Sequence, residues 1–358
     1  MNSYYLKLYD KNHTILDFPE IHVFSNLTYT HTLNGMENLS FTTPIAYCKK
    51  NNIELILGQH IELYKVVNGI ETCIWWGVVG NPSNDAININ VVCYGYIFLL
   101  SGRIFKNLFD NGWTRIYEDV KYGKLITNLI SFVNSASATG ITLGTLEDGD
   151  LKTTREINWN DDLKVKIDEL IEECNYCWNI GIDRKFNFYA TYGTDKSDYY
   201  EINDYNLINT SLSVVDYSNL YNKIYAMNEY TDDNGENVRL SSVKENAESI
   251  KTYGLREKEL AVNDLRIQAT MDAYVQKELD LCSNPSISLT LEVKICDQFN
   301  IDDISVGDYI YLNCPNNLGM IKKLRILEYT VDLAKTTVTV TVGNTLYKDN
   351  TEYKKYKY

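Results

Sequence analysis

The stretch LGQHIELYKVVNGIETCIWWGVVG, residues 57–80, contains two runs of alternating apolar residues on either side of Asn68-Gly69. Such alternation is typical of β-strands, and Asn-Gly between two alternating runs favours a tight hairpin turn. The stretch VGDYIYLNCPNNLGMIKKLRILEYTV, residues 306–331, has the same order of glycine, strand, turn and strand. Gly58 and Gly307 are each followed three residues later by alternating apolar positions. The pattern fits either an internal duplication or two unrelated hairpins that look alike.

Other segments of the first hundred residues also alternate between apolar and polar positions. YYLKLYD, IHVFSNLTYTHTL, NLSFTTPI and ININVVCYGY read as strands, and Asn34-Gly35 and Asn81-Pro82 read as turns. Strands resume after residue 210 with SLSVVD, NLYNKIYAMNEY, SISLTLEVKI and TTVTVTVGN. Many short strands joined by turns are typical of a small barrel or sandwich. We therefore expect a mainly β fold with α insertions, of the α+β class.

Three segments have apolar residues at helical spacing instead. Residues 123–133 and 161–176 each predict an amphipathic helix, and Asp161 and Asp162 suit the N-terminus of the second one because they oppose the helix dipole. A hairpin with its turn at residues 183–185 is expected to follow. The longest helical pattern covers residues 258–281.

Length and composition indicate a folded chain of several domains. The 358 residues exceed what one hydrophobic core usually holds, and 44% hydrophobic with 23% charged residues is typical of globular proteins. The N-terminus lacks the features of a secretion signal, and no apolar run approaches the ~20 residues that span a bilayer. We expect synthesis in the cytoplasm and no membrane segment.

The net charge of -14 argues against a surface that grips nucleic acid, because such a surface would be basic. It is compatible with DNA passing by without adhering, since an acidic or neutral wall repels phosphate or leaves it unbound. No specific nucleic-acid binding is expected.

Cysteine and histidine provide no recognisable catalytic or metal-binding pattern. The eight cysteines lie mostly in apolar runs and are expected to behave as small buried hydrophobic residues. Cys174 and Cys177 form a single CxxC at the C-terminal end of a predicted helix, the wrong end for a reactive thiol. The four histidines, His13, His22, His31 and His60, form no HxxxH pair. The sequence also lacks GxSxG, P-loop and dinucleotide-binding motifs. We expect no catalytic residue, metal or cofactor.

Two acidic pairs and three tryptophans are candidate binding residues. Asp161-Asp162 and Asp302-Asp303 lack the alternating acidic spacing of a calcium loop, and a helix N-terminus and a turn before Gly307 explain them more simply. Trp75, Trp76 and Trp178 have the chemistry to stack on a sugar. Trp75 and Trp76 point to opposite faces of one strand, so one is expected in a core and the other at an interface with another domain or subunit.

With this order of elements, the chain resembles the tail hub family of phages and related contractile particles, including baseplate hub proteins and the N-terminal structural region of tail-associated lysins. The resemblance is carried, in order, by NLTYTHTLNGMENLSFTTPI with residues 57–80, WNDDLKVKIDELIEECNYCWNIGIDRKFNFYA, VVDYSNLYNKIYAMN, and TYGLREKEL with the following helix, SNPSISLTLEV and ISVGDYIYL. In VVDYSNLYNKIYAMN the matching residues are Asp216, Ser218, Leu220 and Asn222. The resemblance implies a homotrimer in which each subunit carries two small β-barrel tube domains. Three subunits would then form a pseudo-sixfold ring between the hexameric tail tube and the threefold spike.

The resemblance also implies a domain division. The first tube domain would cover residues 1–98, a peripheral α+β domain residues 99–206, and the second tube domain residues 207–347 with a helical insertion at about 231–284. Residues 348–358 would form a flexible tail.

Three functions are compared on this basis. The first is a structural hub of the virion tail tip without enzymatic activity, made in the host cytoplasm, contacting a tube or distal tail protein above and a spike or fibre protein below, with a channel for DNA ejection. Lytic members carry their enzymes in long C-terminal extensions, and the chain is expected to leave no room for one. The second is a carbohydrate-binding tail module that uses Trp75, Trp76 or Trp178. The third is a tail-associated peptidoglycan hydrolase.

Overall fold

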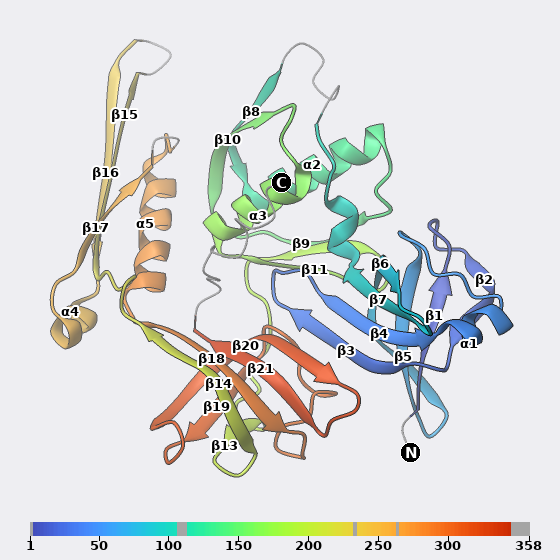
Figure 1. Ribbon diagram of the computed structural model, residues 1–358. Helices are drawn as coiled ribbons and strands as arrows, with labels where there is room; N and C mark the ends of the chain where they lie inside the picture. Colours follow the sequence, from blue (N-terminus) through green and yellow to red (C-terminus); the bar gives the residue numbers. More distant parts are fainter. Residues whose placement is uncertain (1–2, 106–112, 232–234, 263–264, 345–358) are drawn as a thin grey trace.

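The computed structural model describes residues 3–105, 113–231, 235–262 and 265–344. Within these ranges thirteen strands belong to one continuous sheet, and three smaller sheets and five α-helices lie beside it. Figure 1 shows the N-terminal strands in blue at the right, the C-terminal strands in red and orange below with the yellow-green β13 and β14 among them, and the elements between residues 96 and 189 and between residues 217 and 285 above. The expected mainly β architecture with helical insertions is confirmed.

The N-terminal half of the large sheet consists of seven antiparallel strands in the spatial order β3-β4-β7-β6-β5-β1-β2. Their bounds are Ser3–Tyr9 (β1), Ile15–Ile21 (β2), Ser25–Thr32 (β3), Asn38–Pro44 (β4), His60–Val67 (β5), Ile70–Asn84 (β6) and Asn88–Gly95 (β7). Helix α1 (Ile45–Lys50) connects β4 to β5. The hairpin predicted at Asn68-Gly69 joins β5 to β6, with φ of 53° and 81° at its two turn residues. We call β3 to β7 the first repeat.

The C-terminal half has the same topology. Its strands lie in the spatial order β14-β18-β21-β20-β19, and all four contacts between neighbours are antiparallel. Their bounds are Leu207–Asp216 (β14), Ser286–Lys294 (β18), Tyr309–Cys314 (β19), Met320–Asp332 (β20) and Thr337–Gly343 (β21). Strand β13 (Glu201–Asn203) adds to β19 in parallel. We call β14 with β18 to β21 the second repeat.

Hydrogen bonds identify equivalent residues in the two repeats. The Gly58 amide donates to the Val79 carbonyl at 2.9 Å, and the Gly307 amide donates to the Ile326 carbonyl at 2.8 Å. Both glycines have positive φ, 86° and 95°, a conformation that favours glycine. A bulge follows in each repeat, after Val79 and after Ile326. The sequence similarity of residues 57–80 and 306–331 therefore reflects a structural duplication.

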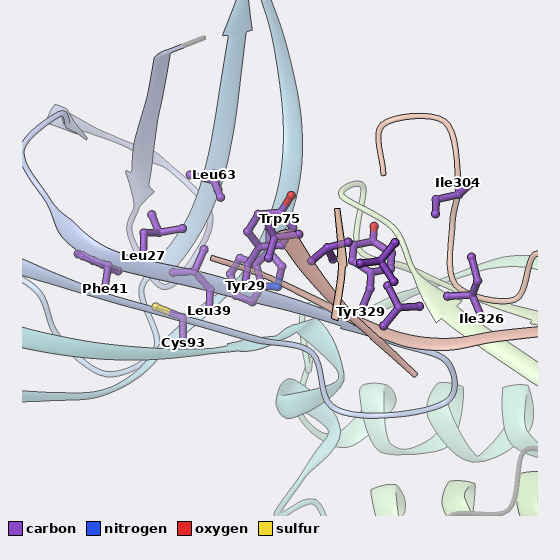
Figure 2. Packing of buried hydrophobic residues seen from close by; sticks show 14 of the residues in the cluster. Leu27, Tyr29, Leu39, Phe41, Leu63, Trp75, Cys93, Ile304, Ile326 and Tyr329 are labelled. Atoms are coloured by element: carbon purple, nitrogen blue, oxygen red, sulfur yellow. The ribbon is translucent and has the colours of Figure 1, made fainter. Parts of the chain in front are cut away.

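The repeats join edge to edge through β3 and β20, which pair antiparallel from Thr28↔Asp332 to Thr32↔Glu328. We call this contact the seam. One hydrophobic core runs beneath both repeats, from Leu27, Leu39 and Phe41 on one side to Ile304 and Ile326 on the other, with Tyr29, Trp75 and Tyr329 between them (Figure 2). The strands form one open sheet in the described residues, so the two expected closed barrels are not seen.

A second core lies in the middle region, residues 96–189. Its elements are η1 (Tyr96–Leu100), β8 (Thr114–Lys121), α2 (Tyr122–Ala136), β9 (Thr142–Glu147), β10 (Lys152–Asn158), α3 (Leu163–Cys174), β11 (Cys177–Ile180) and β12 (Lys185–Tyr189). Both predicted helices are confirmed, and so is the hairpin between β11 and β12. Apolar faces of α2 and α3 pack together and against Phe186 and Phe188.

A third core belongs to residues 217–285, which we call the insert because they separate β14 from β18. The expected helical insertion is wrong in part, because a three-stranded sheet with the order β16-β15-β17 accompanies the helices. The elements are β15 (Lys223–Thr231), β16 (Asn237–Glu245), α4 (Ala247–Tyr253), β17 (Glu257–Ala261) and α5 (Gln268–Cys282). The helix predicted from residue 258 begins ten residues later, since residues 257–261 pair with β15.

Other expectations are corrected or lie outside the described residues. Asn81-Pro82 is not a turn between strands but lies within β6, because this strand continues past its bulge to pair with β7. Residues 348–358, expected as a flexible tail, lie outside the described part of the chain. The predicted domain boundaries at residues 98 and 206 stay predictions.

Candidate functional site: the hydroxyl face and the seam

Small polar side chains cover the sheet face opposite the common core. Strands alternate their side chains between two faces, so each buried apolar residue of these strands is followed by one that points away from the core. On six neighbouring strands, β18, β21, the part of β20 beyond its bulge, β3, β4 and β7, the positions facing away are mostly Ser, Thr or Asn. The set, which we call the hydroxyl face, comprises Ser286, Ser288, Thr290, Thr337, Thr339, Thr341, Thr330, Thr28, Thr30, Thr32, Asn38, Ser40, Thr42, Asn88 and Asn90.

Cross-strand hydrogen bonds connect this face. The hydroxyls of Thr30 and Thr330 lie 2.8 Å apart across the seam. Further contacts join Thr28 to Ser40 at 2.7 Å, Thr290 to Thr341 at 3.1 Å and Thr42 to Asn90 at 3.0 Å. The hydroxyl face is therefore continuous over both repeats, although the first repeat ends at Gly95 and the second begins only at Leu207.

Few charges interrupt the hydroxyl face. Glu292 accepts a hydrogen bond from Thr337 at 2.9 Å, and Glu328 accepts one from Thr32 at 3.0 Å. Asp332 accepts from the Ala334 amide and lies 3.7 Å from Lys335. The face thus offers phosphate many weak hydrogen-bond donors but little positive charge, and the charge it carries is mainly negative.

A buried ion pair lies behind the seam. His31 on β3 is 9% exposed, and its Nδ1 lies 2.8 Å from Glu37 Oε1 while its Nε2 lies 2.9 Å from the Ile74 carbonyl on β6. The rings of Tyr29 and Tyr329 flank His31 with centroid separations of 5.7 and 5.2 Å. A carboxylate and a carbonyl both accept, so both ring nitrogens donate and the imidazole carries a positive charge.

The pKa of His31 is raised by its surroundings. Burial alone opposes the charged form, but the Glu37 carboxylate and the two hydrogen bonds outweigh it and hold the pKa above the ordinary value. The pair connects the seam to β6, because Glu37 precedes β4 and Ile74 belongs to the hairpin strand of the first repeat. None of this was visible from the sequence, because His31 reaches Ile74 only through the fold.

A cavity of about 640 Å³ lies between the two repeats and the middle region. Its walls include Trp76, Trp178, Tyr192 and Tyr329 as well as the His31–Glu37 pair. Lys65 and Asp302, also in the wall, form an ion pair at 2.5 Å between the two repeats. The cavity therefore marks the place where the two repeats approach the middle region.

The three tryptophans considered for sugar binding are arranged differently from what that use requires. Trp75 is fully buried in the common core and Trp178 is 6% exposed. Trp76 is half-buried, packs against the middle core and donates its indole N–H to the Ile180 carbonyl at 2.9 Å. The expected placement of Trp75 and Trp76 in a core and at an interface is confirmed. The most exposed tryptophan is Trp113, 71% exposed and in contact with Trp159, which sequence reasoning missed.

Two histidines that are distant in sequence meet beside a buried carboxylate. The rings of His13 and His60 lie 4.9 Å apart, and His13 Nε2 lies 3.4 Å from Glu62 Oε1. Tyr9 and Tyr64 both donate to Glu62, at 2.7 and 2.8 Å. Burial lowers the pKa of His60 to about 4, so this imidazole is neutral at ordinary pH. In the described residues no cluster of His, Cys, Asp and Glu is suited to a metal ion. His22 lies on the surface beside Glu20.

The cysteines and acidic pairs have structural surroundings. All eight thiols are free, and burial raises the pKa of Cys174 to about 12 and also raises that of Cys177. Such thiols are protonated and poor nucleophiles. Asp162 caps α3 by accepting from the Val165 amide at 3.1 Å, and Asp303 accepts from Asn300 in the turn before Gly307. The predicted helix-terminus and turn roles are confirmed.

No helix in the described ranges has the length and apolar character needed to cross a membrane.

The hydroxyl face was also missed from the sequence, although runs such as TTVTVTV and SISLTLE carry its signal as Ser or Thr at every second position. Their alternation predicts strands, but it does not show that the polar positions of six strands share one face.

Comparison with known proteins supplies the class of the fold. Residues 196–348 match the family model described as prophage endopeptidase tail. No curated protein sequence matches the chain. Prophage tail protein gp18 from Listeria monocytogenes EGD-e is 16% identical, with a TM-score of 0.64 over 96% of this chain and 95% of that one. The 43 kDa tail protein of prophage MuSo2 from Shewanella oneidensis is 12% identical, with a TM-score of 0.64 over 96% and 98%.

A tail protein from Neisseria meningitidis MC58 is 11% identical, with a TM-score of 0.61 over 96% of this chain and 97% of that one. Identities this low establish a shared fold over nearly the whole chain. The family model and the folds point to the same class of protein, so the resemblance to phage tail proteins expected from the sequence is confirmed.

Proposed function

From this likeness to phage tail proteins, we propose that the chain is the structural hub at the distal end of a phage or phage-like tail tube. Three copies form a ring with pseudo-sixfold symmetry, each copy contributing its two repeats as the two tube domains. The ring contacts a hexameric tube or distal tail protein on one side and a threefold spike, tip or fibre protein on the other. The location is the virion tail tip, after synthesis in the host cytoplasm.

The observation that carries this proposal is the duplication. Two repeats with the same strand order lie edge to edge in one sheet, joined at the seam. A chain with two equivalent units can present six of them in three copies, which suits a junction between sixfold and threefold neighbours. A chain with a single unit would need six copies to offer the same contacts.

The hydroxyl face serves as the wall of the central channel in this proposal. Uncharged hydroxyl and amide groups hold phosphate only weakly in water, and Glu292, Glu328 and Asp332 repel it. Lys294 at the end of β18 and Lys335 beyond β20 add little positive charge. DNA or another polyanion therefore passes this wall without adhering.

The proposed hub is not an enzyme. The description of the matched family includes the word endopeptidase, and a peptidase centre of the Ser–His or Cys–His type needs a histidine. Residues 196–348 contain none, since the four histidines are at positions 13, 22, 31 and 60. Incubating the purified chain with cell-wall peptidoglycan should release no product above the buffer control. Catalytic turnover in that assay would contradict this part of the proposal.

An electron cryo-microscopy reconstruction of the particle tip tests the hub function. The proposal expects three copies between a hexameric ring and a threefold component, with Thr30 and Thr330 facing the lumen. Finding the chain on the outside of the particle, or at the end of a side fibre, would contradict it.

A charge variant tests the channel wall in particles that carry DNA. Thr30→Lys with Thr330→Lys should slow DNA ejection, because six ammonium groups per ring would hold the phosphates. Ser241→Lys, on the exposed strand β16 of the insert, is the matched control and should leave the ejection rate unchanged. An unchanged rate in the double variant would show that the hydroxyl face does not line the path of DNA.

A further inference from the structure

The seam uses one edge from each repeat, and the counterparts of these edges are open. In the seam, the end of β20 beyond its bulge pairs with β3. The counterpart of that end in the first repeat is Asn81–Asn84 of β6, because Val79 and Ile326 are equivalent and both bulges follow them. The counterpart of β3 in the second repeat is β14, the outermost strand on that side of the sheet.

The equivalence of β3 and β14 holds residue by residue. In β3, Thr28 lies opposite Ser40 directly after an irregularity in the pairing with β4. In β14, Leu212 lies opposite Thr290, likewise directly after an irregularity in the pairing with β18. Thr28 of β3 therefore corresponds to Leu212 of β14, and four residues further on Thr32 corresponds to Asp216.

Both counterpart edges are accessible. Asn81, Ser83 and Asn84 are exposed, and within the described residues Asn81–Asn84 pairs only with β7. Strand β14 pairs only with β18 in the same part of the chain, and Ile208 and Val215 are 55% and 39% exposed. Open strand edges of this kind are templates for pairing with another chain.

We propose that β6 of one copy pairs antiparallel with β14 of a second copy and repeats the seam between chains. If the pairing of the seam is applied to the equivalent residues of these two strands, Asn81 lies opposite Asp216, as Glu328 lies opposite Thr32 within the chain. We call this pairing the transferred register. The proposal rests on the proposed ring and assigns the surface that closes it. The contact is head-to-tail, since it joins two different edges, and such contacts form closed rings when the rotation per copy allows.

Side-chain chemistry at the transferred register is complementary. Within the chain, the Thr32 hydroxyl donates to the Glu328 carboxylate at 3.0 Å. Between chains, the Asn81 amide would face the Asp216 carboxylate, so a hydrogen-bond donor again faces a carboxylate. Within the chain β3 supplies the donor, whereas between chains β6 would supply the donor and β14 the carboxylate. Pro82 lies at the position of Tyr329 and has no N–H, so the seam between chains has one backbone hydrogen bond fewer than the seam within the chain.

Cysteine cross-linking tests the register. Residues directly opposite in antiparallel strands have Cα atoms about 4.5–5.5 Å apart, within the disulfide range of roughly 4.4–6.8 Å. Asn81→Cys with Asp216→Cys should form oxidised dimers and trimers on a non-reducing gel. Thr32→Cys with Glu328→Cys is the matched control, because it should form a disulfide within one chain and leave the band monomeric.

Mixing the single variants guards against misfolding of the double variant. Asn81→Cys and Asp216→Cys proteins, dissociated, mixed and reassembled, should give a covalent dimer, and neither should do so alone. A trimer by mass that gives no such dimer would overturn the register and leave the hub proposal standing. A chain that stays monomeric by mass would overturn both.

Discussion

The two repeats share their topology but use their edge strands differently. In the first repeat, β3 is covered by β20, and His31 lies buried behind the contact in an ion pair with Glu37. In the second repeat, the equivalent strand β14 has no partner on its outer side among the described strands, and Val215, the residue corresponding to His31, is 39% exposed. The equivalent strand is therefore paired within the chain in one repeat and has an open edge in the other. In our proposal, this open edge pairs with a second copy in the same way as β3 pairs with β20.

The connections between equivalent strands differ as well. β3 and β4 are joined by the five residues 33–37, whereas β14 and β18 are separated by the insert of residues 217–285. The insert has its own core and leaves the register of β14 with β18 in place. Loop positions at the end of a sheet accept such additions because the pairing of the strands does not depend on them.

The largest expected effects come from a matched pair of core residues. Leu39 and Leu289 are equivalent, fully buried and part of one core. Leu39→Ala and Leu289→Ala should each lower the free energy of unfolding by about 3 kcal/mol, since both leave a cavity of similar size. Chemical denaturation measures the two values. A loss confined to one variant would show that the repeats do not share a core as described.

Two equivalent glycines should differ in their tolerance of a methyl group. Both have positive φ, but a Cβ at Gly58 would meet no atom within 4 Å, whereas at Gly307 it would lie 2.7 Å from Cδ1 of Tyr192. Gly58→Ala should cost about 1 kcal/mol from backbone strain alone, and Gly307→Ala about 3 kcal/mol from strain and crowding together. Thermal denaturation of the two variants checks the order, and equal losses would contradict it.

The His31–Glu37 pair predicts a pH dependence that the second repeat cannot have. The pKa of His31 is raised in the folded protein, so the folded state binds the proton more tightly than the unfolded state does. The stability from this pair is fully present below pH ~6.5, the ordinary histidine value, and is lost as the pH rises through the higher folded pKa. The pKa values of Tyr29 and Tyr329 are raised by burial, so these phenols stay neutral in that range.

His31→Gln isolates this effect. Below pH ~6.5 the variant should be less stable than the parent by about 2 kcal/mol, because the substitution breaks a buried charge pair whose carboxylate is partly exposed. This difference in stability should shrink as the pH rises. Val215→Gln, at the corresponding position of β14, is the control and should show no such pH dependence. A difference between parent and His31→Gln that stays constant with pH would contradict the charged imidazole.

The smallest expected effect concerns the hydroxyl bond across the seam. Thr30→Val or Thr330→Val should lower the free energy of unfolding by less than about 1 kcal/mol, because the hydroxyls are partly solvated and each loses one weak bond. Thr290→Val, away from the seam on β18, should have a similar effect. A much larger loss in the first two variants would mean that the hydroxyls themselves hold the seam together.

Local signals in the sequence predicted much of the fold. Asn68-Gly69 specified the β5–β6 hairpin because few other residue pairs adopt positive φ twice. Gly58 and Gly307 suggested a duplication, but their pattern alone did not distinguish it from two similar hairpins. Strand β17 was assigned to a helix because its five residues are stabilised by pairing with β15, which a local pattern does not contain. The seam and the His31–Glu37–Ile74 contacts depend on segments that approach each other only in the folded chain.

The oligomeric state of the purified chain tests the central claim most directly. If two repeats per chain provide six units in a ring, native mass spectrometry should give three copies per particle, and Val215→Pro, which removes a backbone donor from the open edge of β14, should reduce it to single chains. A purified chain that remains monomeric at all concentrations and with its tail partners present would contradict the claim.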